Sequence, residues 1–333
     1  MTTESARRAG RSRYVARIAC TWVFACILGS AASGAAAADV HGWRYLTDKL
    51  VTDGLSEGQV TRVFTDPRMP PFTGLEFSLH PVESHALYKK LLKRAAVVEA
   101  RRCRARYASA LEAAERTQGV PASILTAILF VESSCGRNAG SSPILYGLAR
   151  LAMAAEPANL AANVERHCGD DEHDPAIVEE VHARARYLED TFYPEVRALF
   201  DVAARLRIDP LELRGSPAGA FGYPQFLPTS YLRDGVDADG DGRVSLDEFD
   251  DAAASCGRFL AQRGWRPGMS TQERRAVLWQ YNRSAAYIDT VLALARAVAA
   301  PDAPARPTKT KAAKPRTAKK RRQLAGAGTT LPR

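Results

Sequence analysis

The chain has 333 residues, of which 46% are hydrophobic and 25% are charged. This composition is ordinary for a globular protein, and the length allows one large domain with a sizeable core and appendages. The formal net charge is +9, but residues 302–333 account for +9 and residues 1–39 for +3, so residues 40–300 carry −3. The excess of basic residues therefore lies at the two ends of the chain. The net charge of +9 gives no indication of a site in the folded body.

The first 38 residues are typical of an export signal. Five arginines precede an apolar run at residues 18–30, and the small residues Ala35–Ala38 follow it. We expect cleavage after this stretch, which predicts a protein exported to the periplasm or outer envelope. An uncleaved anchor is the alternative, but the run is short for a bilayer span of about 20 residues. A lipoprotein anchor on Cys20 or Cys26 lacks a suitable context of small residues.

Four cysteines remain in the exported part of the chain. Their even number in an oxidising compartment is compatible with two disulfides, and three pairings are open. Metal ligation is the alternative, because His167 and His173 lie near one of these cysteines, but no CxxC or HExxH spacing supports it. The four are Cys103, Cys135, Cys168 and Cys256.

The body of the chain is expected to be mainly helical, with few strands and no repeats. Apolar residues recur at intervals of three and four in Trp43–Val63, Ala96–Glu115 and His182–Leu206. Four prolines in Thr65–Pro81 predict an extended segment that crosses a folded surface. From Pro301 the chain is rich in Ala, Pro, Lys and Arg, so it cannot build a core and is predicted to be disordered.

The first segment with chemical content is an apolar stretch framed by Pro121 and Gly136, which predicts a buried helix of roughly four turns. Glu132 falls in its last turn, where both the helix dipole and the apolar surroundings disfavour a negative charge. A carboxyl group that stays protonated near neutral pH can act as a general acid on a glycosidic oxygen. The alternative is an ion pair with Arg137 or another base, and the helix alone does not decide between them.

The second segment, residues 214–231, interleaves small residues with aromatic and amide side chains. Glycines let the backbone approach a ligand, aromatic faces stack on sugar rings, and Ser216 and Gln225 can bond hydroxyl and acetamido groups. Alone it is also compatible with a packed turn, but with the first segment it predicts a saccharide groove. A third segment, residues 279–291, places Tyr281, Asn282 and Tyr287 at the start of a last helix.

Three sequences, VESSCGR, GSPAGAFGYPQFLPTSY and YNRSAAYIDTVLALA, resemble in this order the motifs of the lytic murein transglycosylases of the membrane-bound type B family. The resemblance extends from about Trp43 to Ala299. It implies a mainly α, α+β lysozyme-like fold in which a single glutamate, here Glu132, protonates the leaving O4 and then accepts the proton of the muramoyl C6 hydroxyl. The expected products are 1,6-anhydro-MurNAc ends of the peptidoglycan glycan strands.

The resemblance also implies residues that hold the acetamido group of the substrate, which would assist as an internal nucleophile. Ser133 stands where the family often has Thr, and Pro224 replaces a small Gly. The expected substrate-binding residues are Ser133, Ser216, Tyr223, Gln225, Tyr281 and Asn282.

No second acid accompanies Glu132 in the three segments, although ordinary glycosidases need two carboxylates about 5–10 Å apart. This favours the single-glutamate reaction. The alternatives are a lysozyme-type hydrolase that uses water and a peptidoglycan-binding protein without catalysis.

Residues 237–248 have the pattern of an EF-hand calcium loop, with acids at positions 1, 3, 5 and 12 and Gly242 at position 6. A solvated acidic turn is the alternative. Only one loop is present, which predicts a structural Ca²⁺ clamp and not a sensor. The predicted ligands are Asp237, Asp239, Asp241, the carbonyl of Arg243, Ser245 and Glu248.

The predicted organisation has four parts: an export signal at 1–38, a helical region at 39–118 that packs on the core, a lysozyme-like catalytic domain at 119–300, and a basic tail at 301–333. We expect a monomer whose tail contacts anionic envelope polymers or a membrane surface.

Overall fold

The computed structural model describes residues 39–169 and 174–301, and the elements below belong to one compact unit that begins at Val40. The predicted export signal lies outside the described residues, as does the predicted tail apart from Pro301. The helical elements are α1 (Arg44–Thr52), α2 (Glu57–Phe64), α3 (His85–Tyr88), the 3₁₀ helix η1 (Lys89–Leu92), α4 (Arg94–Arg106), α5 (Ala108–Gln118), α6 (Ala122–Ser133), α7 (Ile144–Ala152), α8 (Pro157–Cys168), α9 (Pro175–Leu206), α10 (Pro228–Asp234), α11 (Phe249–Gln262), α12 (Thr271–Tyr281) and α13 (Ala285–Ala299).

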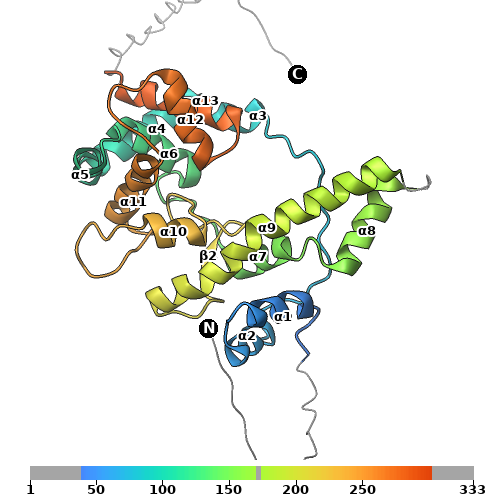
Figure 1. Cartoon of the computed structure of the whole chain (residues 1–333). Coiled ribbons are helices and arrows are strands. Elements are labelled where there is room, and N and C mark those ends of the chain that lie inside the picture. Colours follow the sequence, from blue (N-terminus) through green and yellow to red (C-terminus); the bar gives the residue numbers. More distant parts are fainter. Residues whose placement is uncertain (1–38, 170–173, 302–333) are drawn as a thin grey trace, which may run out of the picture. The chain divides into compact units, whose positions relative to one another are not determined.

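The prediction of a mainly helical fold with few strands is confirmed (Figure 1). The two described strands, β1 (Ser142–Pro143) and β2 (Arg214–Gly215), form one antiparallel pair. This pair joins the chain that follows α6 to the start of the glycine- and aromatic-rich segment. Within the described ranges, no helix is both long and apolar enough to cross a membrane.

Two of the periodic stretches are each divided into two helices. In the first, α1 and α2 are separated at Gly54, whose φ of 97° belongs to the left-handed region that glycine adopts without a steric penalty. In the second, Tyr107 separates α4 from α5, and its ring stacks on Phe249 with centroids 3.6 Å apart. Apolar periodicity predicted the buried faces, but it could not predict these breaks.

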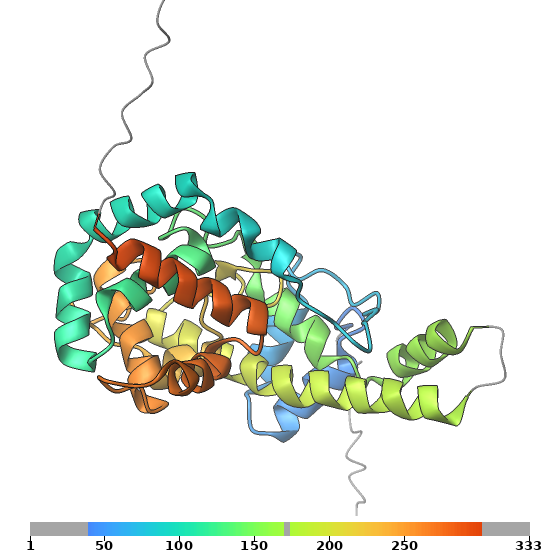
Figure 2. The same cartoon turned by 90° about the horizontal axis from the view of Figure 1, so that it is seen from above.

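Helix α6 lies in the main hydrophobic core, as the sequence predicts for a helix that is apolar on all sides. It packs against α13, α4, α5 and α11. Figure 2 shows α13 next to α4 in the same group of helices. Packing on several sides stabilises a helix that has no polar face of its own, and it brings residues from distant parts of the chain to the end of α6.

The proline-rich segment is extended and crosses the surface as predicted, and helix α8 holds it by side-chain amides. Asn159 accepts a hydrogen bond from the N–H of Leu75 (2.7 Å), and Asn163 donates to the carbonyl of the same residue (2.8 Å). Leu75 and Phe77 are buried in a small second core together with residues of α9. The side-chain amides of α8 therefore pair with backbone N–H and C=O groups of this segment, as a neighbouring strand does in a sheet.

Helix α10 is attached to the long helix α9 by a buried carboxylate. Glu195 accepts hydrogen bonds from the backbone N–H and the hydroxyl of Thr229, at 2.8 and 2.5 Å. Thr229 lies in the first turn of α10, where backbone N–H groups have no partner within the helix. This contact fixes the end of the glycine- and aromatic-rich segment against α9.

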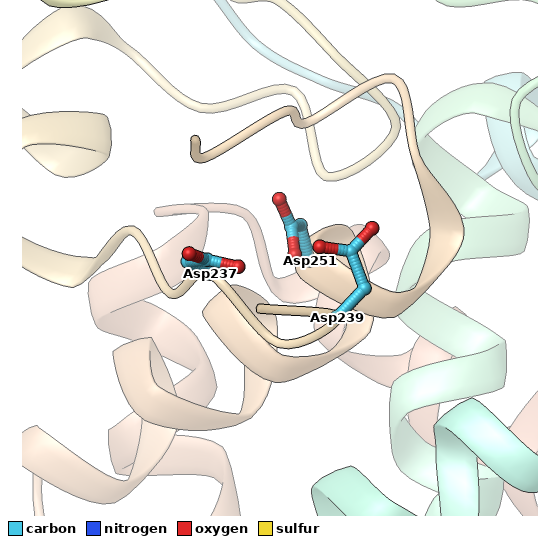
Figure 3. A group of neighbouring side chains, drawn as sticks. All are labelled: Asp237, Asp239 and Asp251. Carbon is cyan, nitrogen blue, oxygen red and sulfur yellow. The ribbon is translucent and has the colours of Figure 1, made fainter. Parts of the chain in front are cut away.

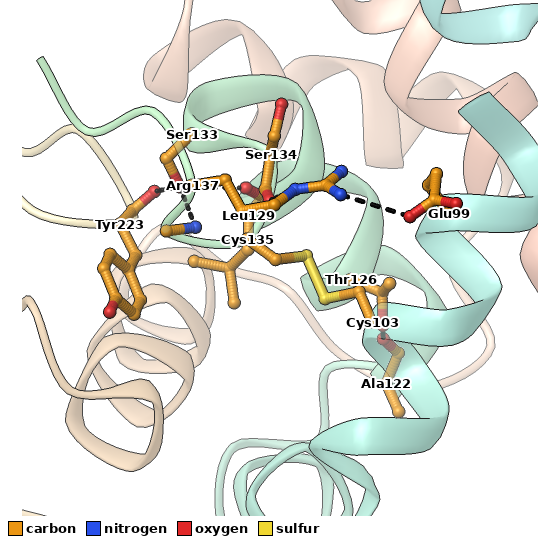
Figure 4. The surroundings of a disulfide bond; sticks show 11 residues. Glu99, Cys103, Ala122, Thr126, Leu129, Ser133, Ser134, Cys135, Arg137 and Tyr223 are labelled. Atoms are coloured by element: carbon orange, nitrogen blue, oxygen red, sulfur yellow. Dashed lines mark hydrogen bonds and ion pairs between the residues drawn. A yellow bond between two sulfur atoms is a disulfide. The ribbon is translucent and has the colours of Figure 1, made fainter.

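One disulfide is present among the four cysteines, and it joins Cys103 of α4 to Cys135 directly after α6 (Figure 4). The second bridge with which the cysteine count was compatible is absent, because Cys168 and Cys256 are free and buried. Cys168 ends α8, which packs on α9, whereas Cys256 lies inside α11, which packs on α5. The even count was misleading because a buried thiol can also serve as a small apolar side chain.

We expect the variant Cys103→Ala/Cys135→Ala to be less stable than the parent protein, because the bridge closes a loop with a sequence separation of 32. A closed loop of this size restricts the unfolded chain by about 3–4 kcal/mol. Denaturant unfolding of both proteins would measure the loss. A matched control is Cys168→Ala, which removes a free thiol, and equal stability of the parent and the double variant would contradict the prediction.

Candidate active site

Glu132 lies in the last turn of α6 and is half-buried. Its Oε1 accepts a hydrogen bond of 2.6 Å from the hydroxyl of Tyr287, which lies in α13 and is only 1% exposed. Arg137 instead forms an ion pair with Glu99, at 3.1 Å. The ion pair between Glu132 and Arg137, one of the two alternatives, is therefore wrong: the chain turns sharply after α6 and carries the guanidinium toward α4.

The surroundings of Glu132 favour its protonated form. Burial raises the pKa of this carboxyl to about 7, the hydrogen bond from Tyr287 opposes the rise, and the negative charge of Glu83 adds to it. Desolvation is the largest of the three effects, as the apolar character of α6 predicts. The group can therefore donate a proton and accept one at neutral pH, while its partial exposure leaves it accessible to a ligand.

Two residues near Glu132 come from a segment that the sequence did not identify. Tyr88 ends α3, its ring lies edge-on to that of Tyr287 with centroids 6.1 Å apart, and its hydroxyl donates to Glu83 at 2.7 Å. Because Glu83 and Glu132 are 49 positions apart in the sequence, no local pattern could have paired them. Only the packing of α3 on α13 does so.

The ring of Tyr281 also packs against that of Tyr287. The rings are nearly parallel, with 9° between their planes and centroids 6.3 Å apart, and the hydroxyl of Tyr281 donates to the carbonyl of Pro224. Burial raises the pKa of Tyr281 and of the Cys256 thiol, which is hydrogen-bonded to it. The predicted position of Tyr281 was wrong: it is the last residue of α12, and Asn282 caps that helix, so of the predicted residues only Tyr287 lies in α13.

A turn of left-handed residues follows α6 and is held by Ser133. Ser134, Cys135 and Gly136 have φ values of 53°, 56° and 85°. The hydroxyl of Ser133 accepts from the N–H of Gly136 (2.9 Å) and donates to the carbonyl of Tyr223 (2.8 Å), as Figure 4 shows. Ser133 is only 1% exposed. These contacts give it a positioning role, and its contact with a sugar stays a prediction.

The glycine- and aromatic-rich segment passes next to this turn. The ring of Tyr223 lies so close to Gly136 that a Cβ atom there would approach it to 2.3 Å, so a larger residue would displace the ring. Gln225 has a φ of 50°, and its amide nitrogen donates to the carbonyls of Ala139 and Gly222, both at 2.8 Å. The hydroxyl of Ser216 accepts from a backbone N–H within the same segment. The structure thus joins this segment to the end of α6.

The acidic loop gathers carboxylates in two overlapping groups, within each of which the ligand atoms lie within 4.8 Å of one another. One group contains Asp237, Asp239 and Asp251, which Figure 3 shows, and the other contains Asp239, Asp241 and Glu248. Gly242 at loop position 6 has a φ of 88°, as a sharp turn requires. Such a set of hard oxygen donors fits a cation of the calcium type.

Asp251 was not among the predicted ligands because it follows the 12-residue pattern. It is buried in the first turn of α11, and its two oxygens accept from the N–H groups of Ala238 and Ser245, both at 2.7 Å. It therefore connects the two ends of the loop. Ser245 and Arg243 donate their backbone N–H groups to Asp251 and Asp241, and their role as ligands stays a prediction.

We expect Glu132 to titrate in the folded protein with a pKa near 7, well above its ordinary 4.5. The variant Tyr287→Phe should raise this pKa further, because it removes a hydrogen bond to the carboxylate. The variant Glu83→Gln should lower it, because it removes a negative charge. Carbon-13 NMR of labelled glutamate carboxyls would follow all three proteins, and an ordinary pKa in the parent would contradict this description of the site.

Residues 40–276 match the family model described as "Transglycosylase SLT domain". Over 162 residues the chain is 34% identical to membrane-bound lytic murein transglycosylase B of Escherichia coli, a match that covers 49% of this chain and 37% of that protein's length. The soluble lytic transglycosylase SltB1 of Pseudomonas aeruginosa has a similar fold, with a TM-score of 0.57 and 22% identity over 77% of this chain and 97% of that one.

The Escherichia coli lytic transglycosylase Slt35 in complex with calcium also has a similar fold, with a TM-score of 0.55 and 23% identity over 78% of this chain and 92% of that one. At these identities the two structures show a shared fold, which agrees with the predicted lysozyme-like class. The match to the family model covers most of the chain, including the helix that carries Glu132 and the segment that follows β2. The chain therefore belongs to the transglycosylase SLT domain family.

Proposed function

We propose that this protein is a peptidoglycan lytic transglycosylase that cleaves the β-1,4 bond between MurNAc and GlcNAc and leaves 1,6-anhydro-MurNAc ends. The observation that carries the proposal is the state of Glu132, a half-buried carboxyl with a pKa raised to about 7 at the end of an apolar helix. Membership of the transglycosylase SLT domain family and the similarity to a murein transglycosylase support the same substrate class.

In the first step, protonated Glu132 donates its proton to O4 of the departing GlcNAc as the bond to C1 of MurNAc breaks. The acetamido oxygen of the same MurNAc attacks C1 and holds the positive charge. In the second step, the Glu132 carboxylate accepts the proton of the C6 hydroxyl while O6 displaces the acetamido oxygen from C1. The proton count is balanced and no water enters, so Glu132 returns to its protonated state.

Tyr287 serves this cycle as a positioning residue. Its hydrogen bond orients the carboxyl and stabilises the carboxylate that exists between the two steps. Tyr281, Asn282, Ser216, Tyr223 and Gln225 are proposed to hold the sugars, with Ser133 behind them. Gln225 is suited to the acetamido group because its two side-chain hydrogen bonds to protein use the amide nitrogen. Its side-chain oxygen can then accept from the acetamido N–H of the sugar.

A lysozyme-type hydrolase is the second candidate, and Glu83 is the observation that favours it. Such an enzyme needs another carboxylate near the acid to activate water. Glu83 is close enough for its charge to affect the pKa of Glu132, but it accepts a hydrogen bond from Tyr88 and lies on the segment before α3. We assign Glu83 an electrostatic effect on the pKa of Glu132 and no water-activating role.

The acidic loop is proposed to bind one structural Ca²⁺ through Asp237, Asp239, Asp241, Arg243, Ser245 and Glu248, with Asp251 connecting the two ends of the loop. The similar structure that contains calcium supports this ion. The backbone N–H of Tyr223 donates to the carbonyl of Leu246 in the loop (2.8 Å), so order in the loop extends to the substrate segment.

Export follows from the proposed substrate, because peptidoglycan lies outside the cytoplasmic membrane. A monomer in the periplasm or outer envelope, with the basic tail on anionic polymers or a membrane surface, is the proposed arrangement. A peptidoglycan-binding protein without catalysis is the alternative from another class, and the next experiment separates it from both enzymes.

We expect Glu132→Gln to lower turnover of purified sacculi by about 10²–10⁴-fold, because the amide can neither donate nor accept the proton. The matched control is Glu179→Gln, whose exposed carboxylate on α9 pairs with Arg186. Mass analysis of the products from the parent enzyme should show anhydro-muropeptides. Hydrated ends would support the hydrolase, and no release of fragments would remove both enzyme functions.

We expect Glu83→Gln to retain most of its turnover and to keep the anhydro products, because the second proton transfer belongs to Glu132. As the pH rises, the activity of this variant should decline at a lower pH than that of the parent, because loss of the Glu83 charge lowers the pKa of Glu132. In the parent, activity should fall as the pH rises above about 7, where the acid loses its proton. A loss of turnover as large as that of Glu132→Gln would assign Glu83 to the chemistry.

We expect chelation of calcium to lower the melting temperature. At a calcium concentration about 100 times Kd, bound ion stabilises a protein by about 2.7 kcal/mol, which is worth about 5–10 °C for a domain of this size. Differential scanning fluorimetry with and without chelator would measure the shift. Asp237→Ala should show no chelator-induced shift in melting temperature. The control Asp250→Ala, which lies outside both acid groups, should show the same shift as the parent. An unchanged melting temperature of the parent protein in chelator would show that the loop holds no ion.

A further inference from the structure

A cavity of about 210 Å³ lies beside the turn that follows α6, between that turn and the end of α4. The Cys103–Cys135 disulfide lines it and ties the two sides together. The proposed mechanism uses none of the cavity residues. The cavity is also lined by Arg102, Arg106, Tyr107, Ser134 and Arg137.

The charge of the cavity is positive. Three arginines line it against one acid, Glu99, which accepts hydrogen bonds from Arg102 (2.5 Å) and Arg137 (3.1 Å). The hydrogen bond from Arg137 is the largest effect that lowers the pKa of Glu99, so this carboxyl is ionised. The side chain of Arg106 makes no hydrogen bond or ion pair with another described residue. An unpaired guanidinium beside two shared ones is suited to a carboxylate, which it can bind with two parallel hydrogen bonds.

The cavity lies next to the proposed reaction centre. Ser134 lines it and is two residues from Glu132, so their Cα atoms are at most about 7 Å apart. Gly136, in the same turn, is in contact with the ring of Tyr223. Both sides of the turn are restrained, because the disulfide ties Cys135 to α4 and Ser133 bonds to the Tyr223 carbonyl. An extended peptide of four residues spans about 14 Å, so a peptide substituent on a sugar bound at Glu132 is long enough to reach the arginines.

We propose that this cavity binds a free carboxylate of the peptide branch that peptidoglycan carries on its MurNAc residues. The proposal rests on the proposed function, because it names a further part of the same substrate. Arg106 supplies the unpaired charge, and Arg102 and Arg137 exchange part of their interaction with Glu99 for the ligand. The cavity adds affinity for glycan that still bears peptides, and it takes no part in cleavage of the glycosidic bond.

The test compares two substrates: glycan strands with their peptides, and the same strands after removal of the peptides by an amidase. We expect Arg106→Ala to raise KM about three- to tenfold on the peptide-bearing strands with little change in kcat, as expected for loss of a partly exposed charged hydrogen bond. On the stripped strands its KM should equal that of the parent. The matched control is Arg116→Ala, an exposed arginine of α5 outside the cavity, which should change neither substrate.

A second variant is expected to change KM in the opposite direction. Glu99→Gln releases Arg102 and Arg137 from their shared carboxylate, so it should lower KM on the peptide-bearing strands and leave the stripped strands unaffected. Equal effects on both substrates, or no effect of Arg106→Ala on either, would overturn the proposal, and the latter result would leave an acidic partner protein as the ligand class to pursue. A parent protein that cleaves neither substrate would instead refute the proposed function.

Discussion

The hydrogen bond from Tyr287 to Glu132 joins two helices whose residues are 155 positions apart, and the candidate site is organised around it. It works against the burial of the carboxyl: desolvation favours the protonated acid, and the hydrogen bond favours the carboxylate. The balance leaves the pKa near neutrality. A residue that must give up a proton and take one back needs this compromise, because a carboxyl buried without a partner would not ionise easily and an exposed one would not hold its proton.

Several independent contacts keep the end of α6 in place. The disulfide ties Cys135 to α4, Ser133 bonds to the turn and to Tyr223, and Tyr281 stacks on Tyr287. Left-handed backbone at two residues other than glycine costs free energy, and such conformations persist where the surroundings restrain them. The turn thus directs Arg137 away from Glu132, and the same restraint forms one side of the arginine-lined cavity.

The acidic loop and the substrate segment form one connected unit. Asp251 holds both ends of the loop by backbone hydrogen bonds, and the loop carbonyl of Leu246 accepts from the N–H of Tyr223. Gly222 lies against Leu246 so closely that a Cβ atom would meet the Leu246 side chain at 2.3 Å. A cation in this loop would stabilise a wall of the site without taking part in the reaction, which agrees with the presence of a single loop in the sequence.

Local sequence determined the helical class, the apolar character of α6, the position of Glu132 in its last turn and the acidic loop, because each depends on residues within a few turns of one another. Tertiary structure alone decided which cysteines pair, that Arg137 turns to Glu99, that Tyr287 bonds to Glu132, and that Tyr88 packs on Tyr287. The disulfide, the pair of Arg137 with Glu99 and the hydrogen bond from Tyr287 to Glu132 join residues 32, 38 and 155 positions apart, and their existence depends on how helices pack. Periodicity shows which face of a helix is buried, but it does not show which other helix covers that face.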